Sequence, residues 1–286
     1  MSYVVRNGLL VPKREVIRRG AAHARVPHAN LILRRIADPI LRPATLAVGF
    51  DAAGTASSHG TVTGATGLTD SNLTIGSSGN CLIYTVSAIV GAGSLNGVAA
   101  HWDSAGTNQA MSNLISGVQT NSSGVQTVIF GLVAPTIGNK TFKLSGSWGT
   151  AFAIVVFGCS FTNVNQTGGA TTFNHTASGT NISSNTTPHV TCTTTTNDAV
   201  VAVMAAANAG GTNTITMGQT TLYTGTGASF PASGANYELN GSTAAMTGTL
   251  SLTDSWVAVA TNMAGIIGGG AVAPRAGLQG LASSEW

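Results

Sequence analysis

The chain has 286 residues, of which only 7% are Asp, Glu, Lys or Arg. Globular domains carry about 25% charged residues, so this composition excludes coiled coils and large helical bundles, whose wet faces need Glu, Lys and Arg. Because 43% of the residues are hydrophobic, enough apolar side chains remain to build a core, and a charge-rich disordered chain is excluded as well.

Residues 1–45 hold most of the charge and are predicted to form an extended basic arm. They contain nine basic and two acidic residues, a net charge of +7, whereas the rest of the chain carries −4. Leucines, isoleucines and valines are interleaved with the arginines, which favours docking onto a protein surface where guanidinium groups bond carboxylates. Phosphate contacts with nucleic acid are a second interpretation, and an anionic membrane surface is a third. The basic residues of this docking arm are Arg6, Lys13, Arg14, Arg18, Arg19, Arg25, Arg34, Arg35 and Arg42.

From Leu46 onward the sequence predicts short β-strands. The candidate segments are rich in Val, Ile, Thr, Phe and Tyr, and clusters of Gly, Asn and Ser separate them at intervals of about ten residues. No convincing helix interrupts them. We therefore predict an all-β fold, an antiparallel β-sandwich of jelly-roll type over residues 46–264 whose strands share one core. The candidate strands include 46–50, 81–90, 97–102, 125–133, 140–146, 151–161, 171–176 and 255–263.

The remaining segment, residues 265–286, is rich in Gly and Ala and is predicted to be a tail. The first residues contain charges and a proline where a secretory leader needs an apolar stretch, so no signal peptide is expected. No run of 18 uninterrupted apolar residues is present, and no transmembrane helix is expected either. Cys81, Cys159 and Cys192 lie in apolar or β-rich runs without CxxC spacing, which favours buried, reduced thiols over a disulfide framework.

The sequence contains no motif that identifies a catalytic residue. Nucleophile-elbow and phosphate-loop motifs are absent, and most acids after the arm lie in turn-like contexts, where Asp bonds the local backbone. His101 and Asp103 are two residues apart, so they could share one strand face and serve a metal or a proton relay. A strand end with a buried Trp102 explains them better, because no third ligand is identifiable. We predict no catalytic residue, metal or cofactor.

The tryptophans raise a separate possibility. Trp102 and Trp148 could stack on a sugar from one face of the sandwich, which makes them candidate glycan contacts. Core packing is the favoured interpretation for both, because a chain with 6% aromatic residues needs its large rings to fill the interior.

Three stretches carry a resemblance to a known kind of module. They are FDAAGTASSHGTVTGATGLTDSNLTIGSSGNCLIYTVSAI (50–89), GNKTFKLSGSWGTAFAIVVFGCSFTNVNQT (138–167) and TTPHVTCTTTTNDAVVAVMA (186–205). The span 50–263 resembles a β-sandwich module rich in Gly, Thr and Ser that occurs in bacteriophage structural proteins and large bacterial surface proteins. The resemblance implies a non-enzymatic module used for display, adhesion or decoration. The arm has no counterpart in that module.

Together these features lead us to expect a structural protein of a virion. The expected component is a bacteriophage capsid decoration or cement protein, a head fibre or another accessory part that docks through residues 1–45 to capsid or other virion proteins. Its copies are expected to form a homo-oligomer, a trimer by analogy. A carbohydrate-binding or adhesin module is the alternative, and a polysaccharide-degrading enzyme is a third class, which requires a pair of carboxylates facing a cleft.

Overall fold

The computed structural model describes residues 3–6, 9–12, 45–63, 67–90, 95, 97–119, 124–146, 152–208, 211–225, 230–239 and 243–266. The chain divides into two units, Met1–Leu41 and Arg42–Trp286. In the first unit, strands β1 (Tyr3–Arg6) and β2 (Leu9–Pro12) form an antiparallel hairpin. The other residues of the predicted arm up to 44 lie outside the described residues.

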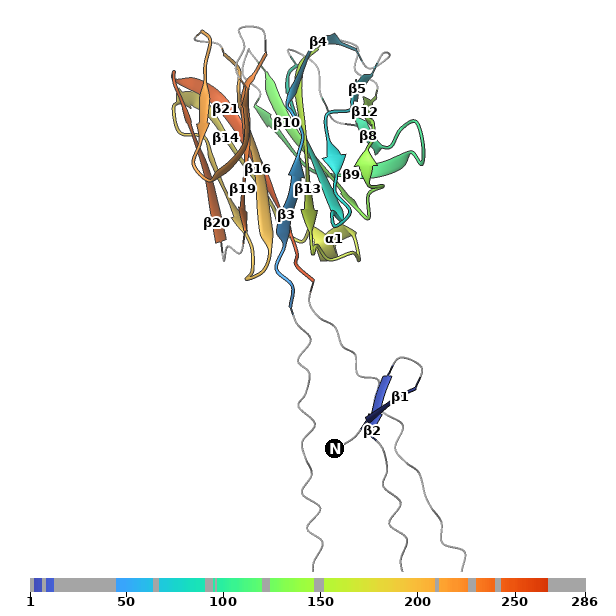
Figure 1. Ribbon diagram of the computed structural model, residues 1–286. Coiled ribbons are helices and arrows are strands. Elements are labelled where there is room, and N and C mark those ends of the chain that lie inside the picture. The colour runs from blue at the N-terminus through green and yellow to red at the C-terminus, as the bar shows by residue number, and fades with distance from the viewer. Residues whose placement is uncertain are drawn as a thin grey trace, which may run out of the picture. The chain divides into compact units, whose positions relative to one another are not determined.

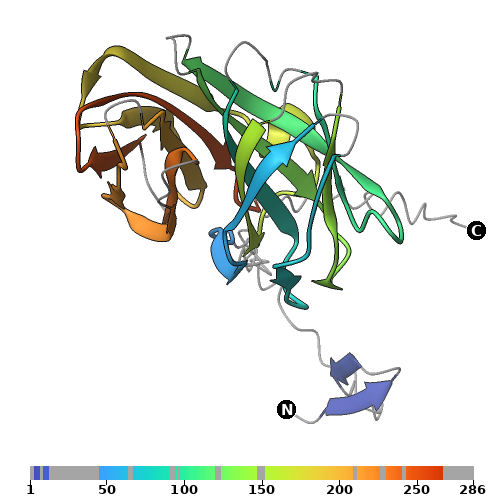
Figure 2. The ribbon, with the colours of Figure 1, turned by 90° about the horizontal axis from the view of Figure 1, so that it is seen from above.

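The second unit is all-β, and all of its described strand pairs are antiparallel. It contains two lobes that lie side by side when viewed along the strands (Figures 1 and 2). The N-terminal lobe consists of β3 (Gly49–Ala53), β4 (Ser57–Val62), β5 (Leu68–Asp70), β6 (Thr74–Ile75), β7 (Cys81–Ile89), β8 (Ala99–Trp102), β9 (Gln109–Gln119), β10 (Val125–Val133), β11 (Gly138–Asn139), β12 (Phe142–Ser145) and β13 (Phe152–Thr162). The C-terminal lobe consists of β14 (Thr176–Asn185), β15 (His189–Thr193), β16 (Ala199–Ala206), β17 (Ile215–Met217), β18 (Thr220–Gly225), β19 (Ala232–Leu239), β20 (Thr243–Leu250) and β21 (Asp254–Met263).

One strand order occurs in both lobes. The N-terminal lobe follows the path β3-β13-β7-β10-β9-β8-β12-β5, with β4 also paired to β13 and with β6 paired to β11. The C-terminal lobe has the sheets β14-β21-β16-β19-β18 and β15-β20-β17. In each lobe the last long strand, β13 or β21, therefore lies between the first strand and a central strand, β7 or β16. The strand before it, β12 or β20, lies between β5 and β8 or between β15 and β17.

The hydrophobic interior differs from the single core that the sequence predicted. One cluster, which includes Tyr84 and Phe130, fills the N-terminal lobe, and another, which includes Met204 and Met246, fills the C-terminal lobe. A third cluster joins Ile83 and Phe157 of the first lobe to other residues of the second, so it lies between the lobes. Strands β7 and β16 consequently bury both faces, which is why their sequences are continuous apolar runs instead of alternating patterns.

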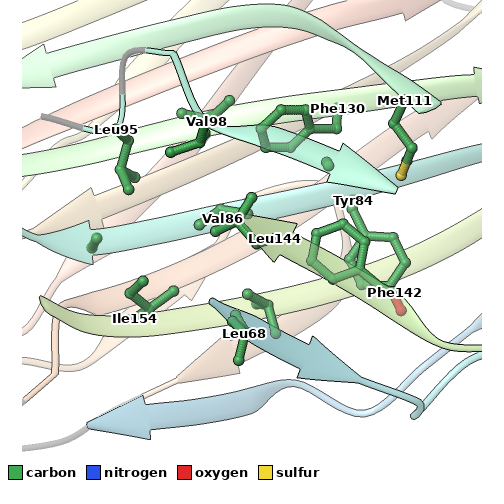
Figure 3. Packing of buried hydrophobic residues seen from close by; sticks show 14 of the residues in the cluster. Leu68, Tyr84, Val86, Leu95, Val98, Met111, Phe130, Phe142, Leu144 and Ile154 are labelled. Atoms are coloured by element: carbon green, nitrogen blue, oxygen red, sulfur yellow. The ribbon is translucent and has the colours of Figure 1, made fainter. Parts of the chain in front are cut away.

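Close packing in the N-terminal lobe depends on a glycine. The rings of Tyr84 and Phe142 are stacked with centroids 3.9 Å apart (Figure 3). Gly158 is the residue opposite Tyr84 on β13, and a Cβ atom there would lie 2.5 Å from Cζ of the tyrosine ring. The ring can lie flat on the sheet only because this position has no side chain.

A short helix, α1 (Gly169–Thr172), follows the N-terminal lobe. The sequence predicted a strand over 171–176, but the structure places the helix at its start and begins β14 only at Thr176. Thr172 explains the local helical turn, because its hydroxyl accepts a hydrogen bond from the Gly168 amide (2.9 Å) and donates one to the Asn165 carbonyl (2.7 Å).

Candidate attachment site

The predicted site residues are only partly within the described chain. Arg6 is the last residue of β1. The other eight basic residues of the docking arm, and Trp148, lie outside the described residues.

Trp102 is a core residue. Its side chain is fully buried, and its indole Nε1 donates a hydrogen bond to the carbonyl of Thr136 (2.8 Å). A ring in this position has no exposed face on which a sugar could stack. The core interpretation therefore holds for Trp102, and the glycan-contact hypothesis loses this residue.

Asp103 forms a turn and does not form a relay with His101. Its backbone has a positive φ of 51°, and its carboxylate accepts hydrogen bonds from the amide (3.0 Å) and the hydroxyl (2.9 Å) of Thr107. The hydrogen bond from the Thr107 amide lowers the pKa of Asp103 below its ordinary value. The hydrogen bond from the Thr107 hydroxyl and the positive charge of Lys140, 3.9 Å away, act in the same direction. The carboxylate thus stabilises the strand end, as the turn interpretation predicted.

The other acids of the N-terminal lobe are similarly engaged by protein groups. Asp51 accepts hydrogen bonds from the Gly76 amide (3.0 Å) and the Ser160 hydroxyl (2.7 Å). Asp70 accepts from the Ser57 hydroxyl (2.7 Å) and the Tyr84 hydroxyl (3.3 Å). Both carboxylates therefore bond to groups of the lobe itself.

Instead, the structure brings together the two ends of the β-structure formed by both lobes. We call this part of the second unit, residues 45–266, the body. Leu46 and Ile266 form an antiparallel bridge in which the Leu46 amide donates to the Ile266 carbonyl (3.0 Å). These residues lie just before β3 and just after β21, which both leave the body at the same end (Figure 1). We call residues 46–48 and 264–266 the pole. Any segment attached before residue 45 or after residue 266 must begin at this one place.

Each strand of the pole is bonded to the opposite lobe. The Val48 amide, at the start of the N-terminal lobe, donates to the carbonyl of Asn197 in the C-terminal lobe (2.9 Å). At the end of the C-terminal lobe, the Ile266 amide donates to the Asn163 carbonyl (3.0 Å), which directly follows β13. These crossed bonds connect both chain ends to both lobes.

A buried carboxylate, that of Asp198, is bonded to the pole. Asp198 is only 4% exposed, and its Oδ1 accepts a hydrogen bond from the Gly265 amide (3.1 Å). Its Oδ2 accepts from the amide (3.1 Å) and hydroxyl (2.9 Å) of Thr195 and from the Asn262 side chain (3.2 Å). A buried charge is tolerated when hydrogen bonds replace its lost water. Asp198 therefore holds the end of the chain against the loop that precedes β16.

Of the two sets of hydrogen bonds that Asp198 accepts, the sequence predicts the local one with Thr195 but not the distant one with Gly265. The segment around Asp198 was predicted to be a turn whose Asp bonds local backbone, and the Thr195 contacts confirm that. The bond to Gly265 was missed because it joins residues 67 positions apart. A Gly residue next to the last apolar strand was the only local signal.

The three cysteines are free and buried, as the sequence predicted. Burial raises the pKa of the Cys192 thiol to about 11, and it also raises the pKa values of Cys81 and Cys159. At neutral pH these thiols are protonated, so they act as small hydrophobic side chains and not as nucleophiles.

No group of three or more His, Cys, Asp and Glu side chains in the described part of the chain could hold a metal ion. Among the described residues no helix is long and apolar enough to cross a membrane. Comparison of the chain with protein families, with curated proteins and with solved structures finds no match.

Proposed function

We propose that the chain is a non-enzymatic structural protein of a virion, a capsid decoration or cement protein, a head fibre or another accessory component, which docks through its N-terminal arm. One observation carries the proposal: both ends of the body meet at the pole, bonded to each other and to both lobes. A body attached in this way presents its opposite end to the surroundings while its flanking segments reach the partner.

Charge supports the assignment of the arm to docking. The sequence before the pole carries +7, and four of the six described acids of the body, Asp51, Asp70, Asp103 and Asp198, bond to groups of the body itself. We infer that the arginines of the arm bond an external partner, and carboxylates on capsid or other virion proteins are the proposed targets. Nucleic acid is the second possible partner of the arm.

The jelly-roll assignment is part of the proposal. What supports it is the strand order. The neighbours β3-β13-β7-β10 of the N-terminal lobe correspond to β14-β21-β16-β19 of the C-terminal lobe, and β5-β12-β8 correspond to β15-β20-β17. The proposed assembly is a homo-oligomer in the virion, with a trimer as the first state to test.

Co-purification with particles tests the docking role. Tagged full-length chain and a variant lacking residues 1–41 are expressed during production of the virus, and particles are purified on a density gradient. We expect the full-length chain in the particle fraction and the truncated chain outside it. A variant lacking residues 267–286 is the matched control, because it shortens the other segment at the pole. Equal incorporation of the chain without residues 1–41, or absence of the full-length chain from particles, would refute arm-mediated docking.

A further inference from the structure

The two strands next to the pole, β3 and β21, are both hydrogen-bonded to neighbouring strands along their length. Residues 49–62, in β3 and β4, run along β13 from Thr162 to Phe152. Strand β21 lies between β14 and β16 and pairs with both, so it has a ladder of hydrogen bonds on each side. Strand β3 begins just after the pole and β21 ends just before it, at the same end of the body (Figure 1).

The direction of a pull decides how such ladders fail. Antiparallel hydrogen bonds are perpendicular to the strands. A pull along the strand therefore shears all bonds of a ladder together, whereas a pull across the strand opens them one after another. From this geometry we propose that the body is a load-bearing element, which resists tension between the pole and its far end by placing β3, β4 and β21 in shear.

The lobes share this load because they are joined along their length. Near the pole, Phe50 of β3 stacks on Tyr237 of β19 with ring centroids 5.0 Å apart. Toward the far end, Val125 of β10 packs with Ala205 and Val257 of the C-terminal lobe. A force that enters through β3 is thus passed to the lobe that holds β21.

The same arrangement is weak in another direction. If the two chain ends are pulled apart from each other, the body turns so that the force crosses the strands. The Leu46–Ile266 bridge and the first pairs of β3 with β13 are then opened one by one. The biological use of the strong direction rests on the proposed attachment to a particle, but the mechanical property belongs to the isolated chain.

Single-molecule force spectroscopy tests this anisotropy with the full-length chain. Thr212, exposed in the far-end turn after β16, is replaced by Cys as a handle, and the three native cysteines do not compete because they are buried. The chain is pulled between residue 212 and the N-terminus, between residue 212 and the C-terminus, and between its two termini. We expect the first two unfolding forces to exceed the third by a factor of about two or more, because forced unfolding reports the barrier along the pulling direction.

A handle at Leu252→Cys, also exposed and at the far end, replaces the first if Thr212→Cys does not fold. Equal forces in the three geometries, or the highest force between the two termini, would overturn the proposal. Because no particle takes part in the measurement, its failure leaves the docking role standing, and failure of docking leaves the mechanical result standing.

Discussion

At the scale of the residue, Asp198 binds the C-terminal strand of the pole through its carboxylate. In Asp198→Asn, an amide NH2 group takes the place of one acceptor oxygen and faces groups that are themselves donors, including the Gly265 amide or the Thr195 and Asn262 donors. We expect a loss of about 2 kcal/mol in the free energy of unfolding, because buried polar groups are left unsatisfied. This loss corresponds to a fall in Tm of about 4–8 °C for a body of this size.

Thermal unfolding by circular dichroism measures the difference. Glu238→Gln is the matched control, since it makes the same chemical change in a side chain that is only half-buried. Equal Tm values for Asp198→Asn and the wild-type chain would show that the carboxylate does not hold the pole together.

We expect His59 to make the stability of the N-terminal lobe depend on pH. Its Nε2 atom is buried without a hydrogen-bond partner among the described residues, and burial lowers the pKa of His59 below 6.5 despite the opposing effect of Asp70. The unfolded chain therefore takes up a proton near pH 6.5, whereas the folded chain takes it up only at lower pH. The stability is complete above pH 6.5 and falls as the pH drops through this value toward the pKa of the folded state.

His59→Asn is expected to flatten this decline. Urea unfolding midpoints of the wild-type chain and the variant are compared between about pH 7 and about pH 5. His189→Asn, at an exposed position, serves as the control and should keep the wild-type slope. An unchanged slope in His59→Asn would assign the pH dependence to other groups.

At the scale of the element, β13 illustrates how a sheet is fitted to an aromatic ring. An alanine at Gly158 would place its Cβ atom within the contact distance of the Tyr84 ring, which is itself stacked on Phe142. Overpacking of this kind costs about 1–3 kcal/mol, because the rings must shift from their positions. We expect Gly158→Ala to lower the urea midpoint accordingly. Gly60→Ala on β4 is the control and should retain the wild-type midpoint, since the nearest atom to its added methyl group is 3.9 Å away.

The strands also show what the sequence could and could not predict. β10 was predicted at 125–133 and β21 at 255–263, close to their observed bounds, because both are dense in apolar and β-branched residues. β9 and β4 were missed, because Ser, Asn, His and Gly interrupt their apolar pattern. β4 is a strand because it pairs with β13, and this contact between distant residues leaves no local signal.

The division into two lobes was missed for a related reason. The sequence predicts one common core for all strands, although a run that is apolar at every position, such as 199–206, is typical of a sheet covered on both faces. The pattern indicates the second covering layer but not its identity. The pole depends on the pairing of Leu46 with Ile266, which are 220 residues apart, and no pattern within either segment predicts that pairing.

At the scale of the whole molecule, the two ends of the body are joined to each other at the pole. The repeated strand order gives each lobe its own interior, and the cluster between the lobes then makes them one unit with the boundary at Arg42. Residues Met1–Leu41 form a separate compact unit. We therefore expect folding of the body to be separable from residues 1–41, with the separation between residue 41 and the pole.

A pair of truncations locates this separation. Removal of residues 1–41 leaves the crossed hydrogen bonds of the pole in place, so we expect a Tm within about 1 °C of the full-length value, since surface changes away from buried features have small effects. Removal of residues 1–48 also removes the Leu46 and Val48 amides and the buried Val48 side chain. Burial of one such side chain contributes about 1.5–3 kcal/mol, so the Tm should fall by several degrees. Calorimetry of both variants makes the comparison, and equal losses would place the arm inside the folding unit instead of outside it.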